Sequence, residues 1–184
     1  IATFCESPIV SEQCVTRIFP AVDPEMAVLA GCALPTGAGA VLHAATPEPT
    51  GAICIIGAGG VGLAAVSGAV LAGWPTIAVT DVRPLRLARA QQLGATHLID
   101  VRTDDVDAAV TQATAGNGFD LVIECAGVAR AMEMAVRISK PRGGRIVIFG
   151  NLAAGGTCAV DPMDLIRGRE LSGSWGGGVS PDTD

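Results

Sequence analysis

The sequence contains no tyrosine, and aromatic residues make up only 3% of its 184 residues. Its core must therefore be built from small and aliphatic side chains, which agrees with a hydrophobic fraction of 49%. Charged residues are also scarce, at 16%, so the chain lacks the composition of a disordered protein. A chain of this length can form one domain with a sizeable core and a small appendage.

Basic side chains are too few and too scattered to form a nucleic-acid interface. The chain has 12 Lys and Arg residues against 18 Asp and Glu residues, which gives a formal net charge of −6. Proteins that bind nucleic acids need a basic patch or stripe to neutralise phosphates. We therefore expect no nucleic-acid partner.

The cysteines form no CxxC pair. They are scattered along the chain, at Cys5, Cys14, Cys32, Cys54, Cys125 and Cys158. In a chain without a visible signal peptide, such cysteines are typically free thiols in a reducing compartment. We therefore expect a cytoplasmic protein. Because the sequence starts at Ile1 rather than at Met, we also expect a piece of a longer protein, natural or engineered.

An uncharged apolar run, GAICIIGAGGVGLAAVSGAVLAGW at 51–74, is long enough for a membrane helix. It contains seven glycines, however, and four of them lie within 57–62. Before this cluster, residues 52–56 are apolar and β-branched, which is typical of a buried parallel strand. After it, residues 61–72 have the composition and spacing of a helix. The run therefore predicts a strand, a glycine turn and a helix, and we expect no membrane span.

The turn matches the pattern G-x-G-x-x-G at Gly57, Gly59 and Gly62. Gly57 would let the strand turn sharply, Gly59 would let backbone N–H groups approach a pyrophosphate, and Gly62 would let the helix lie close to the strand. The pyrophosphate would lie at the helix N-terminus, where the helix dipole favours an anion. We predict that these glycines contact a dinucleotide together with Gly60 and Val61. Taken alone, the motif is a weak signal.

The next predicted strand ends at Asp81, 19 residues after Gly62. An acidic side chain at this spacing accepts hydrogen bonds from the adenosine ribose of a dinucleotide. An ordinary strand-end or helix-capping role is the alternative. The acid would repel a 2′-phosphate and favour NAD over NADP, although Arg83 or Arg86 could accommodate that phosphate. We predict that Asp81, Val82 and Arg86 contact the adenosine.

Strands and helices continue to alternate along the rest of the chain. We expect further strands at 76–80, 97–99, 120–124, 145–149 and 170–175, and helices at 84–93, 104–115, 129–138 and from 162. Six strands in this alternation predict an α/β protein with a doubly wound parallel sheet of order 3-2-1-4-5-6, the Rossmann fold. Ligands of such sheets bind at the carboxyl ends of the strands. We therefore expect Cys125, Ala126, Gly150 and Trp175 to contact the cofactor as well.

The segment before the sheet has a different character. Residues 1–22 alternate loosely between apolar and polar and predict strands detached from a neighbouring domain. Residues 23–50 predict linking helices, interrupted over 31–37. The dinucleotide-binding domain would then span 51–178, and 179–184 would form a tail.

Several stretches resemble a known family. GCALPTGAGAVLH, GAICIIGAGGVGLAAV and TDVRPLRLARAQQLGATHLID are similar to the zinc-dependent alcohol dehydrogenases of the medium-chain dehydrogenase/reductase superfamily, most closely to their aryl-alcohol branch. GFDLVIECAG, GGRIVIFG and GRELSGSWGGG fit the same pattern. The resemblance covers the whole chain but matches only the C-terminal part of such an enzyme. It implies a remnant of the GroES-like catalytic domain at 1–22, followed by the NAD-binding Rossmann domain.

The resemblance also implies roles for individual residues. The family motif G-C-G-x-x-T-G is matched by Gly31, Cys32, Thr36 and Gly37, with Ala33 in place of a glycine. In the family, the cysteine is the third ligand of the catalytic zinc and the threonine lies near the nicotinamide. A buried thiol that interrupts the helix is the alternative for Cys32. Zinc held by two cysteines and one histidine would bind the alcohol, and hydride would then pass to the cofactor.

No motif for the other zinc ligands is present, so no complete catalytic set lies in this chain. His43 and His97 are its only histidines, and we expect both to be surface or packing residues. The isolated chain should therefore bind NAD(H) without turning over alcohol. The resemblance implies that the full-length enzyme oxidises alcohols, with aryl or benzyl alcohols favoured, to aldehydes or ketones.

Two other functions stay open: a zinc-free, NADPH-dependent quinone reductase and a non-catalytic dinucleotide-sensing module. Cys32 and Asp81 speak against the reductase, because that branch typically lacks the zinc cysteine and selects NADP. For the assembly, we predict a homodimer through the edge strand 170–175, because exposed sheet edges tend to be paired or covered.

Overall fold

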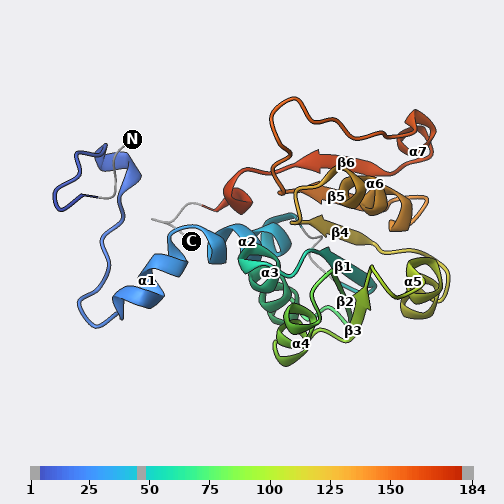
Figure 1. The fold of residues 1–184 in the computed structure, drawn as a ribbon, viewed down its shortest axis with the longest axis horizontal. Coiled ribbons are helices and arrows are strands. Elements are labelled where there is room, and N and C mark those ends of the chain that lie inside the picture. Colours follow the sequence, from blue (N-terminus) through green and yellow to red (C-terminus); the bar gives the residue numbers. More distant parts are fainter. Residues whose placement is uncertain (1–4, 45–48, 180–184) are drawn as a thin grey trace.

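The computed structural model describes residues 5–44 and 49–179, and its centre is a six-stranded sheet (Figure 1). The strands are β1 (Ala52–Ile56), β2 (Thr76–Asp81), β3 (His97–Asp100), β4 (Leu121–Glu124), β5 (Arg145–Ile148) and β6 (Glu170–Gly173). Their order is β3-β2-β1-β4-β5-β6, and every neighbouring pair is parallel. The predicted Rossmann order is thus confirmed.

Helices cover both faces of the sheet. They are α1 (Pro24–Ala30), α2 (Ala33–Ala44), α3 (Gly60–Leu71), α4 (Pro84–Gln92), α5 (Val106–Thr114), α6 (Ala129–Ile138) and α7 (Pro162–Ile166), with short 3₁₀ turns η1 (Glu12–Cys14) and η2 (Gly176–Gly178). Side chains of α2, α3 and α4 join one core cluster, and those of α5 and α6 join the cluster on the opposite face. The core therefore lies in two layers, one on each side of the sheet.

The central strand β1 shows why the sheet takes this form. All five of its residues are buried. Ile53 and Ile55 pack into one cluster, whereas Cys54 and Ile56 pack into the other. A strand covered on both faces needs apolar side chains at every position, and this explains its unbroken apolar sequence.

The apolar run 51–74 folds into β1, a turn and α3, as the sequence predicts. The 12-residue helix α3 is apolar around much of its surface and largely buried between the sheet and α2. Of the helices in the described residues, none alone is long and apolar enough to span a membrane. A bent pair, 24–30 and 33–43, meets that test on length and composition, with an angle of 45° between its parts.

Two expectations about the N-terminal segment are wrong. Residues 5–22 contain no strand: they form only η1 and extended or bent chain, and Figure 1 shows them leading away from the sheet. An isolated strand has no partner for its backbone groups, so a strand-like pattern alone does not produce one. The helical break is also shorter than 31–37, because α2 begins at Ala33. Pro35 then falls in the first turn, where a missing N–H costs nothing.

Candidate functional site

The glycine turn between β1 and α3 has the geometry that its sequence predicts. Gly57 has φ +92°, a conformation that side chains rarely adopt, and its N–H donates to the carbonyl of Thr80 at 2.8 Å. A Cβ on Gly62 would lie 1.8 Å from the carbonyl oxygen of Gly57. No residue with a side chain fits there without moving the turn, so Gly62 sets how closely α3 approaches β1.

The outer side of this turn is open. A Cβ on Gly59 would meet no atom within 4 Å. Gly59 is also the N-cap of α3 and has no side chain to accept hydrogen bonds from the first amides of the helix. The N–H groups at Gly60 and Val61, together with the positive end of the helix dipole, therefore remain available to an anion.

Asp81, at the end of β2, is 6% exposed and binds backbone amides with both carboxylate oxygens. Oδ2 accepts from the N–H of Ala58 at 2.8 Å, and Oδ1 accepts from the N–H of Arg83 at 2.8 Å. The guanidinium of Arg86 lies 3.7 Å from Oδ2. Asp81 thus joins the end of β2 to the glycine turn, a contact that the sequence did not predict. Contact with a ribose stays a prediction, as it does for the exposed Val82 and the half-buried Arg86.

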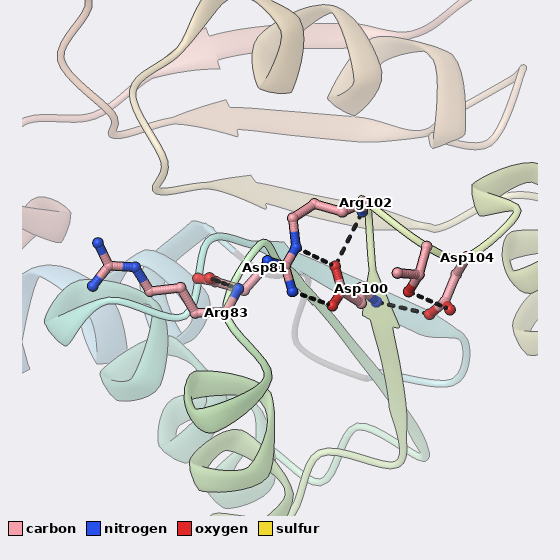
Figure 2. Close-up of polar contacts among 6 residues, drawn as sticks. Asp81, Arg83, Asp100, Arg102 and Asp104 are labelled. Carbon is pink, nitrogen blue, oxygen red and sulfur yellow. Dashed lines mark hydrogen bonds and ion pairs between the residues drawn. The ribbon is translucent and has the colours of Figure 1, made fainter.

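A second acid lies beside Asp81 at the same edge of the sheet. Asp100 ends β3 and is the register partner of Asp81. Arg102 donates to both of its carboxylate oxygens, from Nε at 3.0 Å and from Nη2 at 2.8 Å (Figure 2). These hydrogen bonds hold the pKa of Asp100 below its usual range. The side chain of Arg83 points away from this cluster, and it forms no ion pair with any residue that the structure describes.

The sequence analysis missed the Asp100–Arg102 pair. A signal was available: an acid follows the apolar residues of β3, and the carboxyl ends of parallel strands share one edge of the sheet. Asp104 and Thr103 complete the cluster. The carboxylate of Asp104 accepts from the N–H of Asp100 at 2.8 Å and from the hydroxyl of Thr103 at 3.1 Å.

The loops after β4 and β5 close the other side of the site. A Cβ on Gly57 would lie 3.0 Å from the Cβ of Ala126, so the loop after β4 touches the glycine turn. A Cβ on Gly150 would lie 2.1 Å from the N–H nitrogen of Gly127, so the two loops also touch each other. Cys125 is half-buried beside them, and burial raises the pKa of its thiol to about 12. The thiol is therefore neutral at physiological pH.

Glu124, the last residue of β4, is the other acid that sequence reasoning missed. It is 0% exposed, and its Oε1 accepts from the N–H groups of Ala126 at 2.8 Å and Gly127 at 2.9 Å. Burial raises the pKa of this carboxyl, although the N–H groups of Gly127 and Ala126 and, least of the three, that of Gly150 oppose the rise. The sequence LVIE reads as a strand with a polar end, and nothing local shows that the end is enclosed.

Thr36 lies beside the glycine turn because α2 packs against α3. A Cβ on its neighbour Gly37 would lie 2.1 Å from the carbonyl oxygen of Val61, so the two helices meet backbone to backbone. From the other side, a Cβ on Gly177 would lie 2.6 Å from the carbonyl oxygen of Thr36. Trp175, which precedes this segment, is 91% exposed. The structure thus brings Thr36 to the turn but leaves Trp175 in solvent.

The residues needed for a zinc site do not come together in the described part of the chain. Cys32 lies at the exposed turn between α1 and α2, so the alternative of a buried thiol is wrong. His43 is exposed, and His97 contacts the hydroxyl of Thr96. Across residues 5–44 and 49–179, no group of three or more His, Cys, Asp or Glu side chains could hold a metal ion. One thiolate does not fit a catalytic zinc, which takes three protein ligands.

Comparisons with known proteins agree with this geometry. A family model described as zinc-binding dehydrogenase matches residues 60–183. The S-(hydroxymethyl)glutathione dehydrogenase of Synechocystis sp. is 34% identical over 97% of this chain and 48% of its own length. Alcohol dehydrogenase 1 of Petunia hybrida is 32% identical over 100% of this chain and 48% of its own length. The chain thus spans about half the length of the curated relatives it matches.

Solved structures give the same result. The benzyl alcohol dehydrogenase of Acinetobacter calcoaceticus superposes with a TM-score of 0.84 and 32% identity, over 91% of this chain and 46% of that one. A putative zinc-binding dehydrogenase of Sinorhizobium meliloti, bound to NADP, gives a TM-score of 0.75 and 29% identity, over 86% and 46%. The glycine turn, the sheet order and these matches together show that the chain belongs to the zinc-binding dehydrogenase family, within the medium-chain dehydrogenases/reductases, and has the fold of their cofactor-binding domain.

Proposed function

We propose that this chain binds NAD(H) and that the whole protein is an alcohol dehydrogenase that acts on aryl or benzyl alcohols. The observation that carries the proposal is the turn at 57–62. Its close contact between Gly57 and Gly62 leaves no room for a side chain, and the N-terminus of α3 beside it is open. Two relatives named as dehydrogenases of alcohols, from Petunia hybrida and Acinetobacter calcoaceticus, support the reaction class.

The residues of this chain would bind and orient the cofactor. The amides at the start of α3 bind the pyrophosphate, and Asp81 holds the turn in place through Ala58. Arg86, half-buried beside Asp81, borders the ribose. A nicotinamide dinucleotide supplies the hydride acceptor when bound. The neutral thiol of Cys125 adds no charge to the cleft.

NAD rather than NADP is the proposed cofactor, because the carboxylate of Asp81 would repel a 2′-phosphate. The NADP-bound relative from Sinorhizobium meliloti supports the other choice, as does the guanidinium of Arg83, which points away from the acidic cluster (Figure 2). A preference for NADPH would therefore mean that Arg83 or Arg86 outweighs Asp81, and it would favour the quinone reductase reading.

Zinc and turnover belong to the whole protein in this proposal. Cys32 would supply one zinc ligand, and the other ligands would come from outside the described residues. We therefore expect this chain alone to bind cofactor without oxidising alcohol. We also propose a cytoplasmic homodimer that pairs through β6, an edge strand exposed at all four positions.

A calorimetric titration of this chain with NADH and, separately, with NADPH tests the proposal. We expect saturable binding of NADH and much weaker binding of NADPH. Gly59→Ala is the matched variant, because its methyl group meets no protein atom but enters the space where the pyrophosphate would lie. Failure of the parent chain to bind either dinucleotide would contradict the proposal.

A further inference from the structure

The buried carboxylate of Glu124 lacks a counterion. Its Oε2 lies against the backbone of Gly150, whose N–H favours the ionised carboxyl least of the three nearby amides and donates to the main-chain carbonyl of Glu124 at 3.1 Å. Oε2 itself is buried without a hydrogen bond, and in residues 5–44 and 49–179 no lysine, arginine or histidine pairs with it. An enclosed carboxylate of this kind is costly to ionise, so it destabilises the fold at neutral pH. A residue that costs stability at the carboxyl end of a strand, where ligands of such sheets bind, is a candidate for a functional role.

Glu124 occupies the point of the sheet where the two halves of the fold meet. In β4 it is the register partner of Ile56 in β1 on one side and of Ile148 in β5 on the other. The sheet runs outward in opposite directions from the β1–β4 boundary, and a dinucleotide crosses the sheet at such a switch point. The half that begins with β4 would hold the second nucleoside, which carries the nicotinamide.

The hydrogen bonds of Glu124 do not by themselves explain a carboxylate. Oε1 accepts two amides of the loop after β4, and the amide oxygen of a glutamine could accept them equally. A glutamine would also avoid the cost of a buried charge. The contacts therefore explain an acceptor at this position, and the negative charge needs another reason.

We propose that the buried charge of Glu124 favours the oxidised dinucleotide, with its cationic nicotinamide ring, over the reduced form. The inference rests on the proposed function. The ring carries a positive charge only when oxidised, and the rest of the dinucleotide is the same in both forms. An enclosed anion near the ring interacts strongly because little solvent screens it. Glu124 then acts through its field, without touching the ring.

Titration of three chains with NAD⁺ and NADH tests the proposal: the parent, Glu124→Gln and Asp120→Asn. Glu124→Gln keeps the acceptor and removes the charge, so the ratio of Kd for NAD⁺ to Kd for NADH should rise about fivefold. Asp120 precedes the opposite end of β4 and pairs with Lys140. Asp120→Asn removes the same unit charge there, and the ratio should stay within about twofold of the parent.

A second measurement needs no variant. In the parent chain the ratio should rise as the pH falls from 8 toward 4.5, the ordinary pKa of the carboxyl, because the raised pKa means that Glu124 is then mostly protonated. Cys125, whose thiol is electrostatically coupled to Glu124, stays neutral throughout, with its pKa at about 12. Phosphates and adenine titrate alike in both forms of the dinucleotide and cancel in the ratio.

The outcomes separate the inference from the function on which it rests. A ratio that is the same in Glu124→Gln and in the parent overturns the inference and leaves NAD(H) binding intact. An equal loss of affinity for both forms also overturns it, because Glu124 would then only hold the loop. If Glu124→Gln does not fold, the parent chain decides: a Kd ratio of NAD⁺ to NADH that does not change between pH 8 and pH 4.5 overturns the inference. A parent chain that binds neither form overturns both.

Discussion

Two acids end neighbouring halves of the sheet, and they are used differently. Asp81, in the half with the glycine turn, has an amide on each carboxylate oxygen and an arginine 3.7 Å away. Glu124, in the other half, has two amides on one oxygen, no hydrogen bond on the second and, within residues 5–44 and 49–179, no cationic partner. Both are buried. Burial alone therefore does not indicate what a carboxylate does: Asp81 accepts backbone amides with both oxygens, whereas Glu124 accepts them with only one.

The largest loss of stability should come from a substitution in the glycine turn at 57–62. Gly62→Ala would place a methyl group 1.8 Å from the carbonyl oxygen of Gly57, so α3 or the turn must move. We expect a loss of about 2–3 kcal/mol in the free energy of unfolding, measured by urea denaturation, and the loss of NADH binding. Gly59→Ala serves as the control, with stability within about 0.5 kcal/mol of the parent but weakened NADH binding.

Equal stability of Gly62→Ala and Gly59→Ala would contradict this account. It would mean that the turn can accommodate a side chain at Gly62, and that the close approach of α3 to β1 does not depend on glycine.

The next effect compares the two acids directly. Asp81→Ala removes the acceptors of two backbone amides, one buried and one partly buried, and should lower the free energy of unfolding by about 2 kcal/mol. Glu124→Gln keeps the acceptor of its amides and removes a costly charge, so at pH 8 it should match or exceed the parent in stability. Urea denaturation of the two variants side by side measures both values. A larger loss in Glu124→Gln than in Asp81→Ala would reverse the comparison.

Glu124 should also make a smaller contribution, to the way in which the free energy of unfolding changes with pH. Because the pKa of Glu124 is raised in the folded state, the folded protein holds this proton when the unfolded chain has already lost it. The stability contribution is therefore full below the unfolded value of about 4.3 and is lost as the pH rises through the folded pKa. For this one group, the free energy of unfolding cannot change by more than about 1.4 kcal/mol per pH unit.

Thermal or urea unfolding from pH 4.5 to pH 8 measures this contribution, with Glu124→Gln as the reference that lacks the proton. The difference between the parent and the variant should favour the variant increasingly as the pH rises. A difference that does not change with pH would show that the carboxyl is not perturbed by burial.

The sequence was sufficient to predict the strand order and the glycine turn, because both follow from local patterns. Apolar β-branched runs mark buried strands, and the spacing of Gly57, Gly59 and Gly62 marks a strand–turn–helix junction. The strand-like pattern of residues 5–22 failed for a related reason. Local alternation does not supply the neighbouring strand that a sheet requires.

The roles of the acids could not be read in the same way. Glu124 is enclosed only because β1 and β5, which are distant in sequence, flank β4 at that point. The same holds for the amide of Ala58 that Asp81 binds across 23 residues of sequence. The spacing from Gly62 predicted that Asp81 contacts a ribose. The contact seen in the structure is with the N–H of Ala58 in the glycine turn. Partners across the sheet are decided by topology and not by local sequence.

Asp100, a third acid at this edge of the sheet, should give the smallest change in stability. Asp100 is paired with Arg102 at the surface, where solvent screens the pair, so Arg102→Ala should change stability less than any variant above. The pKa of Asp100 should rise from its lowered value toward its usual range, because its main cause, the side-chain hydrogen bond from Arg102, is lost. NMR titration of the carboxyl measures this rise, with Asp81→Asn as a variant that leaves the pair intact. An unchanged pKa in Arg102→Ala would mean that the backbone N–H of residue 102, which also donates to Asp100 at 3.0 Å, holds the carboxylate by itself. The three acids would then differ in burial but share one feature, in that backbone amides rather than side-chain cations hold each of them.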